Sequence, residues 1–141
     1  MPLSGSLLET SDYTGAGYLP LVDFAGWRVA MLRYIDELLP DRLEAVQRHD
    51  ETDEVFVLLA GRCILFLGDG RDGVGAIYAE DMQPLKVYNV KRGAWHTHTL
   101  SKDATVLIVE NRDTSDYNSP QAPLSREQRQ HIVRLADKLW A

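Results

Sequence analysis

Apolar and polar residues alternate over short runs along most of the chain, with turn residues between the runs. The segments WRVAMLRY (27–34) and LEAVQRH (43–49) show this alternation, and DELLPD between them reads as a turn. Further short runs follow in AIYAEDM, LKVYNV, AWHTHTL and TVLIVEN, separated by turn sequences such as KRG and SKD. Short apolar runs at intervals of about ten residues predict an all-β sandwich or barrel.

One longer apolar segment, EVFVLLAGRCILFLGDG (54–70), is divided into two runs at Ala60-Gly61. Two apolar runs on either side of a glycine predict a β-hairpin. Both faces of these runs are apolar, so we expect both faces of the strands to be covered.

The two ends of the chain differ from its middle. The first twenty residues are rich in Gly, Ser and Thr and have weak periodicity, which predicts an extended N-terminal arm. Near the C-terminus, SREQRQHIVRLADKLW begins with a capping box formed by Ser125 and Gln128 and continues with apolar residues at helical spacing. We therefore expect a C-terminal α-helix over about residues 126–139, with His131 as a solvated residue on its polar side.

The composition limits the classes of function. A chain of 141 residues is long enough for one domain with one core. The net charge of −6 argues against a nucleic-acid partner and against an anionic membrane surface. The chain has no apolar run long enough for a transmembrane helix and no signal-peptide pattern, so the cytoplasmic location is the default expectation. The lone cysteine, Cys63, lies in an apolar run and is expected to pack in the core.

Three candidate metal ligands lie in two separate segments. His49 and Glu54 precede the run VFVLLAG, and His96 follows Gly93 where a neighbouring strand would begin. On that strand Glu54 would share a face with Phe56, where an unpaired carboxylate is costly, although it could instead end a solvated acidic loop. Two imidazoles and one carboxylate suit Fe(II), Mn(II), Ni(II) or Zn(II), with open positions for a substrate.

These spacings resemble the two motifs of the cupin superfamily. His49, Glu54 and Gly61 match the second histidine, the glutamate and the closing glycine of the first motif. Gly93 and His96 match the glycine and histidine of the second motif. The likeness covers about residues 24–110, and WRVAMLRY, RHDETDEVFVLLAG and LIVENRDTS are similar to segments of small single-domain bacterial cupins of uncharacterised function.

The resemblance implies a single domain over residues 1–141, folded as a cupin-like jelly-roll β-barrel with the N-terminal arm and the C-terminal helix added. It also implies a divalent metal ion held by His49, Glu54 and His96, and a homodimer. Three positions depart from the motifs: Gln47 replaces the first histidine, Lys91 the proline and Leu100 the asparagine. Gln47 thus stands where a fourth metal ligand is usual, and its carbonyl is a weak, hard donor.

His98 shares a strand face with His96 and has three open roles. It could replace the fourth ligand, act as a catalytic acid or base with a pKa near neutrality, or be a buried core histidine. We take the acid or base as the functional hypothesis for His98. Trp95 faces the other way and is expected to pack in the wall of the barrel.

The sequence therefore predicts a metal-binding protein that acts on a small polar or anionic metabolite. The metal would polarise a substrate oxygen or activate water or dioxygen. A non-catalytic small-molecule-binding module, with or without a metal, is the alternative that Gln47 favours. A dimerisation scaffold with a filled barrel is a third interpretation, and the fold itself does not select a reaction.

Overall fold

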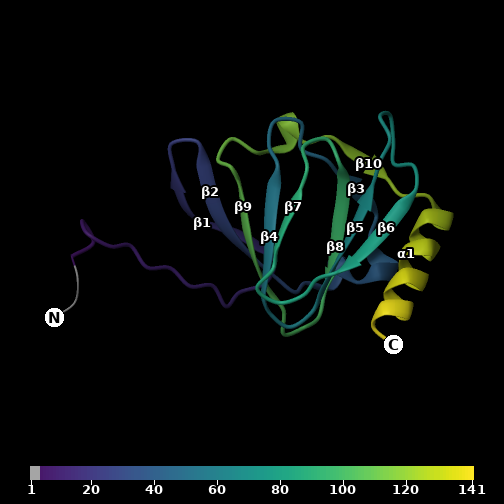
Figure 1. Ribbon diagram of the computed structural model, residues 1–141, viewed down its shortest axis with the longest axis horizontal. Coiled ribbons are helices and arrows are strands. Elements are labelled where there is room, and N and C mark those ends of the chain that lie inside the picture. Colours follow the sequence, from purple (N-terminus) through teal and green to yellow (C-terminus); the bar gives the residue numbers. More distant parts are fainter. Residues whose placement is uncertain (1–3) are drawn as a thin grey trace.

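Two five-stranded antiparallel sheets form the body of the protein, which a computed structural model describes over residues 4–141 (Figure 1). The first sheet has the order β1-β2-β9-β4-β7, and the second has the order β10-β3-β8-β5-β6. The strands are β1 (Tyr18–Phe24), β2 (Trp27–Arg33), β3 (Ala45–Gln47), β4 (Glu54–Ala60), β5 (Cys63–Gly68), β6 (Ile77–Asp81), β7 (Val87–Val90), β8 (Trp95–Leu100), β9 (Thr105–Asn111) and β10 (Gln121–Pro123). This architecture confirms the predicted all-β jelly roll.

The helices are few and mostly short. The α-helix α1 (Arg126–Leu139) lies at the C-terminus, and three single-turn 3₁₀-helices are η1 (Asp36–Leu38), η2 (Pro40–Arg42) and η3 (Asp116–Asn118). The segment predicted as a turn between β2 and β3 thus contains η1 and η2. Within the described residues, no helix is long and apolar enough to cross a membrane.

The inner faces of the two sheets enclose the main core. Along β4 and β9 buried and partly buried residues alternate, so that Phe56, Leu58, Val106 and Ile108 point inward. A strand with one face on a core and one face nearer solvent has this period of two. The same alternation carries Glu54 and Glu110 onto the inner faces of β4 and β9.

A second apolar cluster lies between the outer face of the second sheet and α1 (Figure 1). Ile64 and Phe66 of β5 and Trp95 of β8 pack with Ile132 of the helix. Because β5 contacts the other sheet on one face and the helix layer on the other, nearly all of its residues are buried. This explains why the strand is apolar on both faces, as the sequence indicated. Cys63 is also buried, as expected.

The helix α1 begins where the sequence predicted. The backbone N–H of Gln128 donates to Oγ of Ser125 at 3.1 Å, and the backbone N–H of Ser125 donates to Oε1 of Gln128 at 2.8 Å. The expectation for His131 was wrong. Its ring is half-buried, and Nε2 lies 3.2 Å from the carbonyl oxygen of Ile77 in β6, so it ties the helix to the sheet instead of facing solvent.

The hairpin predicted at Ala60-Gly61 is also wrong. The strands β4 and β5 on either side of this turn belong to different sheets: β4 pairs with β7 and β9, whereas β5 pairs with β6 and β8. The glycine correctly marks a chain reversal, but the reversal crosses from one sheet to the other. Local sequence does not determine which strands pair, because each run is apolar enough to lie in either sheet.

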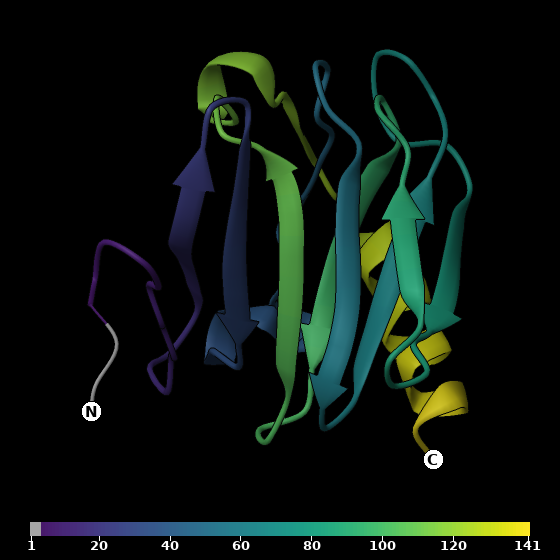
Figure 2. The same cartoon turned by 60° about the vertical axis from the view of Figure 1, so that its left-hand side comes forward.

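The N-terminal arm is shorter than predicted. Residues 4–12 are exposed and extend away from the sheets (Figures 1 and 2). The carbonyl oxygens of Gly15 and Gly17 already accept hydrogen bonds from Arg33 of β2, and β1 begins at Tyr18. β1 pairs with β2 alone and so forms an edge of the first sheet. The arm prediction for residues 1–3 lies outside the described residues. The side-by-side order of β1, β2, β9 and β4 is clearest in Figure 2.

Replacing Gly61 by alanine is predicted to destabilise the protein strongly. Gly61 has a φ of +72°, and an added Cβ would lie 2.5 Å from Cα of Ala104. The left-handed backbone alone costs an alanine about 1–2 kcal/mol, and the backbone collision adds to this. We expect Gly61→Ala to lower the free energy of unfolding, measured by urea denaturation, by more than about 2 kcal/mol.

Two other glycines separate these effects. Gly93 has a φ of +83° with no described atom within 4 Å of an added Cβ, so Gly93→Ala should show the conformational cost alone. Gly26 has the same free space without a left-handed backbone, so Gly26→Ala should change stability by less than about 0.5 kcal/mol. Equal effects at all three positions would contradict this account of the turn.

Candidate metal centre

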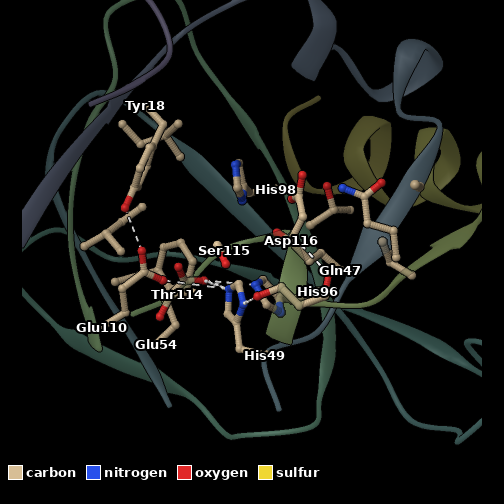
Figure 3. Close-up of a pocket in the computed structure, with 18 of the residues that line it drawn as sticks. Tyr18, Gln47, His49, Glu54, His96, His98, Glu110, Thr114, Ser115 and Asp116 are labelled. Carbon is tan, nitrogen blue, oxygen red and sulfur yellow. Dashed lines mark hydrogen bonds and ion pairs between the residues drawn. The ribbon is translucent and has the colours of Figure 1, made fainter. Parts of the chain in front are cut away.

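His49, Glu54 and His96 meet at one end of the space between the sheets (Figure 3). His49 follows β3, Glu54 opens β4, and His96 lies in β8. Nε2 of His96 lies 2.9 Å from Oε1 of Glu54, and Nε2 of His49 lies 3.3 Å from the same oxygen. The three side chains are buried, and each offers one ligand atom within 4.8 Å of the others. The structure thus brings together the three residues that the sequence singled out.

Both imidazoles are held so that Nε2 points into the cluster. Nδ1 of His96 lies 3.1 Å from the carbonyl oxygen of Ala94, which can only accept a hydrogen bond. Nδ1 of His49 lies 2.7 Å from Oγ of Ser119, a hydroxyl that is itself within reach of the Asn118 side-chain oxygen. Metal-ligating histidines characteristically have the second nitrogen bonded in this way, which fixes the tautomer and the ring orientation.

With this tautomer, two lone pairs face each other inside the cluster, and a cation can bind both of them. If Nδ1 of His96 carries the ring hydrogen, Nε2 presents a lone pair to the carboxylate oxygen of Glu54. Their contact then requires either an additional proton or a cation between them. A divalent metal satisfies both lone pairs at once, so the donor atoms present here fit a metal ion.

The charges in the cluster act strongly on one another. Burial raises the pKa of the Glu54 carboxyl, but its contacts with His49 and His96 outweigh burial and hold the pKa well below the usual range. Burial lowers the pKa of His49, yet the Glu54 contact outweighs it and raises the pKa above the ordinary value. The cluster therefore keeps Glu54 ionised in the interior, which is the form that binds a metal.

Three residues beside the cluster were not singled out from the sequence: Glu110, Tyr18 and Arg28. Oε1 of Glu110 accepts a hydrogen bond from the Tyr18 hydroxyl at 2.6 Å. Nε and Nη2 of Arg28 donate to the same oxygen at 3.1 and 2.8 Å. A signal for Glu110 was present in TVLIVEN, because strict alternation places this glutamate on the same inward face as Val106 and Ile108. Tyr18 and Arg28 gave no such signal.

Glu110 lies close to the cluster as well. Its Oε2 is 3.8 Å from Nε2 of His49. Burial, together with the neighbouring Glu54 carboxylate, raises the pKa of Glu110 to about 7. Two buried carboxyl groups side by side are not both readily ionised, so the metal-free cluster favours a proton on Glu110.

Gln47 and His98 line the same pocket but stand outside the cluster. The Gln47 side chain makes only a long contact, 3.5 Å from Nε2 to the carbonyl oxygen of Ser119. His98 lies on the same face of β8 as His96, and Figure 3 shows its ring apart from the other labelled histidines. Among the described residues, Nδ1 of His98 has no hydrogen-bond partner.

The environment of His98 differs from the sequence expectation. Burial, with a smaller contribution from His96, lowers the pKa of His98 to about 4 instead of leaving it near neutrality. The ring is thus neutral at pH 7 and available as a hydrogen-bond donor or acceptor. Trp95 faces the opposite side of β8, as expected, where it is buried and its Nε1 donates to the carbonyl oxygen of Gly70 at 2.9 Å.

A cavity of about 380 Å³ opens beside the cluster (Figure 3). Apolar residues such as Leu32, Phe56 and Ile108 line part of it, and Thr114, Ser115 and Asp116 add polar groups. Arg28 is the only arginine or lysine among the described residues of the lining, and Glu110 already engages it. The cavity has the size and the mixed lining of a small-molecule site.

Comparison with known proteins identifies the fold. No protein-family model and no curated protein sequence matches this chain. Among solved structures, BH2720 from Bacillus halodurans is 14% identical with a TM-score of 0.52, and the match covers 86% of this chain and 84% of that chain. WlaRA, a TDP-fucose-3,4-ketoisomerase from Campylobacter jejuni, is 14% identical with a TM-score of 0.51, covering 79% and 75%. KdgF from Halomonas sp. is 10% identical with a TM-score of 0.50, covering 71% and 81%.

These are cupin-fold proteins, and the chain has the fold of a small cupin. The resemblance recognised in its two motifs is confirmed at this level. At such low identities the likeness concerns the fold, and the chemistry of this chain must be argued from its own site.

Removing the Ser119 hydroxyl tests how His49 is oriented. Ser119→Ala would leave Nδ1 of His49 buried without its acceptor, which costs about 1–3 kcal/mol. We expect this loss in urea unfolding, and we expect the ¹⁵N chemical shifts of the His49 ring to move away from a pure Nδ1–H tautomer. Ser6→Ala, in the exposed arm, is the control and should change neither quantity. Unchanged stability and an unchanged tautomer in Ser119→Ala would refute this role.

Proposed function

We propose that this protein binds one divalent transition-metal ion through His49, Glu54 and His96 and uses it to bind and transform a small polar metabolite in the adjoining cavity. One observation carries the proposal. Two imidazole Nε2 atoms and a carboxylate oxygen, all buried, converge on one point while both Nδ1 atoms are fixed from behind. Such an arrangement is typical of a metal site.

The donor set narrows the choice of metal. Two nitrogen donors and one carboxylate, with further positions free, suit Fe(II), Mn(II), Ni(II) or Zn(II). Such an ion supplies Lewis-acid chemistry: it polarises a coordinated oxygen or lowers the pKa of bound water. The open side of the cluster faces the cavity, which is where a substrate oxygen would have to approach.

The lining residues favour a ligand that is polar and compact. Hydroxyl groups of Thr114 and Ser115 and the carboxylate of Asp116 can bind ligand hydroxyls, while Phe56 and Ile108 exclude water. Among the described lining residues no arginine or lysine is free to bind an anionic ligand, because Arg28 already forms an ion pair with Glu110. Its negative charge would have to be matched by the metal itself.

His98 is the proposed proton-handling residue. Its neutral ring lines the cavity, and its unpartnered Nδ1 is available to a ligand. A neutral imidazole can accept a proton from a substrate hydroxyl or orient it by a hydrogen bond. With a pKa lowered to about 4, His98 is unprotonated at neutral pH, so it accepts a hydrogen bond from the ligand and is only a weak base.

A non-catalytic binding module without a metal is the second candidate. In favour of it, Gln47 replaces a usual imidazole ligand, and a proton on an imidazole would let His49, Glu54 and His96 satisfy one another without a metal. The homodimer and the cytoplasmic location stay predictions from the sequence.

Metal binding by the purified full chain separates the two candidates. We expect about one Mn(II) or Zn(II) per chain by elemental analysis, and calorimetry should give weaker binding, by at least about 100-fold, for His49→Ala and for His96→Ala. His131→Gln, which alters a histidine on α1 outside the cluster, should bind as the wild type does. A wild-type chain that binds no metal, or equal binding by all variants, would leave the metal-free module as the function.

A further inference from the structure

Glu110 presents a buried oxygen atom, Oε2, that meets no hydrogen-bond donor among the residues that the structure describes. Its side chain is 2% exposed. A buried carboxylate oxygen that lacks a partner is costly. In the metal-free chain a proton shared with the Glu54 carboxylate gives Oε2 a partner, and a bound metal ion would take the place of that proton.

The other oxygen of Glu110 is firmly held. The Tyr18 hydroxyl and two guanidinium N–H groups of Arg28 all converge on Oε1. Arg28 and Glu110 are direct cross-strand partners between β2 and β9, so the ion pair lies within the sheet itself. With Oε1 fixed from behind, the carboxylate is oriented so that Oε2 faces the cluster.

Strand register places this carboxylate opposite another one. Val55 pairs with Val109 between β4 and β9, so the next residues, Glu54 and Glu110, face each other on the inner side. Like charges directly opposite on neighbouring strands are destabilising. A proton or a cation must lie between them, and His49 and His96 already direct nitrogen atoms to the same place.

The separation of Glu110 from His49 agrees with a common ion. Among the described residues, only the donor atoms of His49, Glu54 and His96 lie within 4.8 Å of one another, so the Glu110 carboxylate has to move closer to them when the ion binds. Donor atoms around a metal with bonds of about 2.1 Å are separated by roughly 3–4 Å, depending on the bond angle. Oε2 of Glu110 lies 3.8 Å from Nε2 of His49, and Nε2 of His49 lies 3.3 Å from Oε1 of Glu54. The 3.8 Å separation is too long for a hydrogen bond and is of the size expected for two ligands of one ion.

We infer that Glu110 is a fourth protein ligand of the metal centre, and that it supplies through Oε2 the donor that is lost where Gln47 replaces a histidine. This inference rests on the proposed metal site. Tyr18 and Arg28 are then positioning residues, which orient the carboxylate by its other oxygen. The resulting set of two imidazoles and two carboxylates is harder than a set with three imidazoles, and it favours Mn(II) or Fe(II) more than such a set does.

The test compares Mn(II) affinity and the visible spectrum of the Co(II)-loaded chain. The d–d bands of Co(II) report the number and kind of its ligands, so they respond to loss of a ligand independently of any activity. Glu110→Gln should weaken Mn(II) binding by at least about 100-fold and change the Co(II) bands. Tyr18→Phe should weaken binding by about tenfold and leave the band pattern near that of the wild type. Glu80→Gln, an exposed glutamate of β6, is the matched control and should change neither.

Each other outcome has a definite meaning. If the wild type binds metal and Glu110→Gln matches it in affinity and spectrum, Glu110 is not a ligand, although the proposed function stands. Weaker binding with an unchanged Co(II) spectrum would also overturn the ligand assignment, because the effect would then be indirect. If the wild type binds no metal, the proposed function fails and this inference fails with it. If Glu110→Gln does not fold, Glu110→Asp replaces it in the test. Aspartate keeps the charge but has a shorter side chain that moves the oxygen away from the cluster, and its Mn(II) affinity and Co(II) spectrum are compared in the same way.

Discussion

The buried carboxylate of Glu54 is the constraint on which the site depends. It opens β4 on the inward face, where a lone charge would be strongly unfavourable. His49 and His96, from the segments around β3 and β8 of the opposite sheet, reach this carboxylate with their Nε2 atoms. The interaction therefore joins the two sheets at the end where the cavity opens. The two imidazoles that stabilise the buried Glu54 carboxylate thus also form, together with it, a set of converging metal donors.

The strand arrangement explains how the other residues are positioned. Because β9 lies between β2 and β4, Glu110 stands between Arg28 on one side and Glu54 on the other. One guanidinium and two carboxyl groups thus follow one another across the first sheet, and the two imidazoles meet the second carboxyl group. The helix α1 covers the outer face of the second sheet, and none of its residues lines the cavity.

The sequence predicted the elements well where they depend on local pattern. The short apolar runs located β2 to β9, and the Ser125–Gln128 capping box located the start of α1, whereas β1 and β10 were not predicted. Predictions that depended on long-range pairing were less successful. The glycine at position 61 marked a reversal, but the strands beside it lie in different sheets, and the exposure expected for His131 ignored the β6 carbonyl that it meets.

The residues of the site were likewise predictable where local spacing identified them, and not where strand pairing or burial decides. His49, Glu54 and His96 could be found because their spacing resembles known motifs, whereas Glu110 required knowing that β9 lies beside β4. The near-neutral pKa expected for His98 was wrong because burial cannot be read from the chain, and burial dominates that pKa. Tyr18 contributes from the first strand, just after an arm with weak periodicity, so no sequence signal linked it to Glu110.

The most direct measurement is anomalous scattering from a crystal of the full chain grown with Mn(II) or Zn(II). The account predicts one strong anomalous peak per chain, bounded by Nε2 of His49, Nε2 of His96 and Oε1 of Glu54. Peaks found only on exposed carboxylates, or a Glu54 side chain turned away from the two histidines, would contradict it.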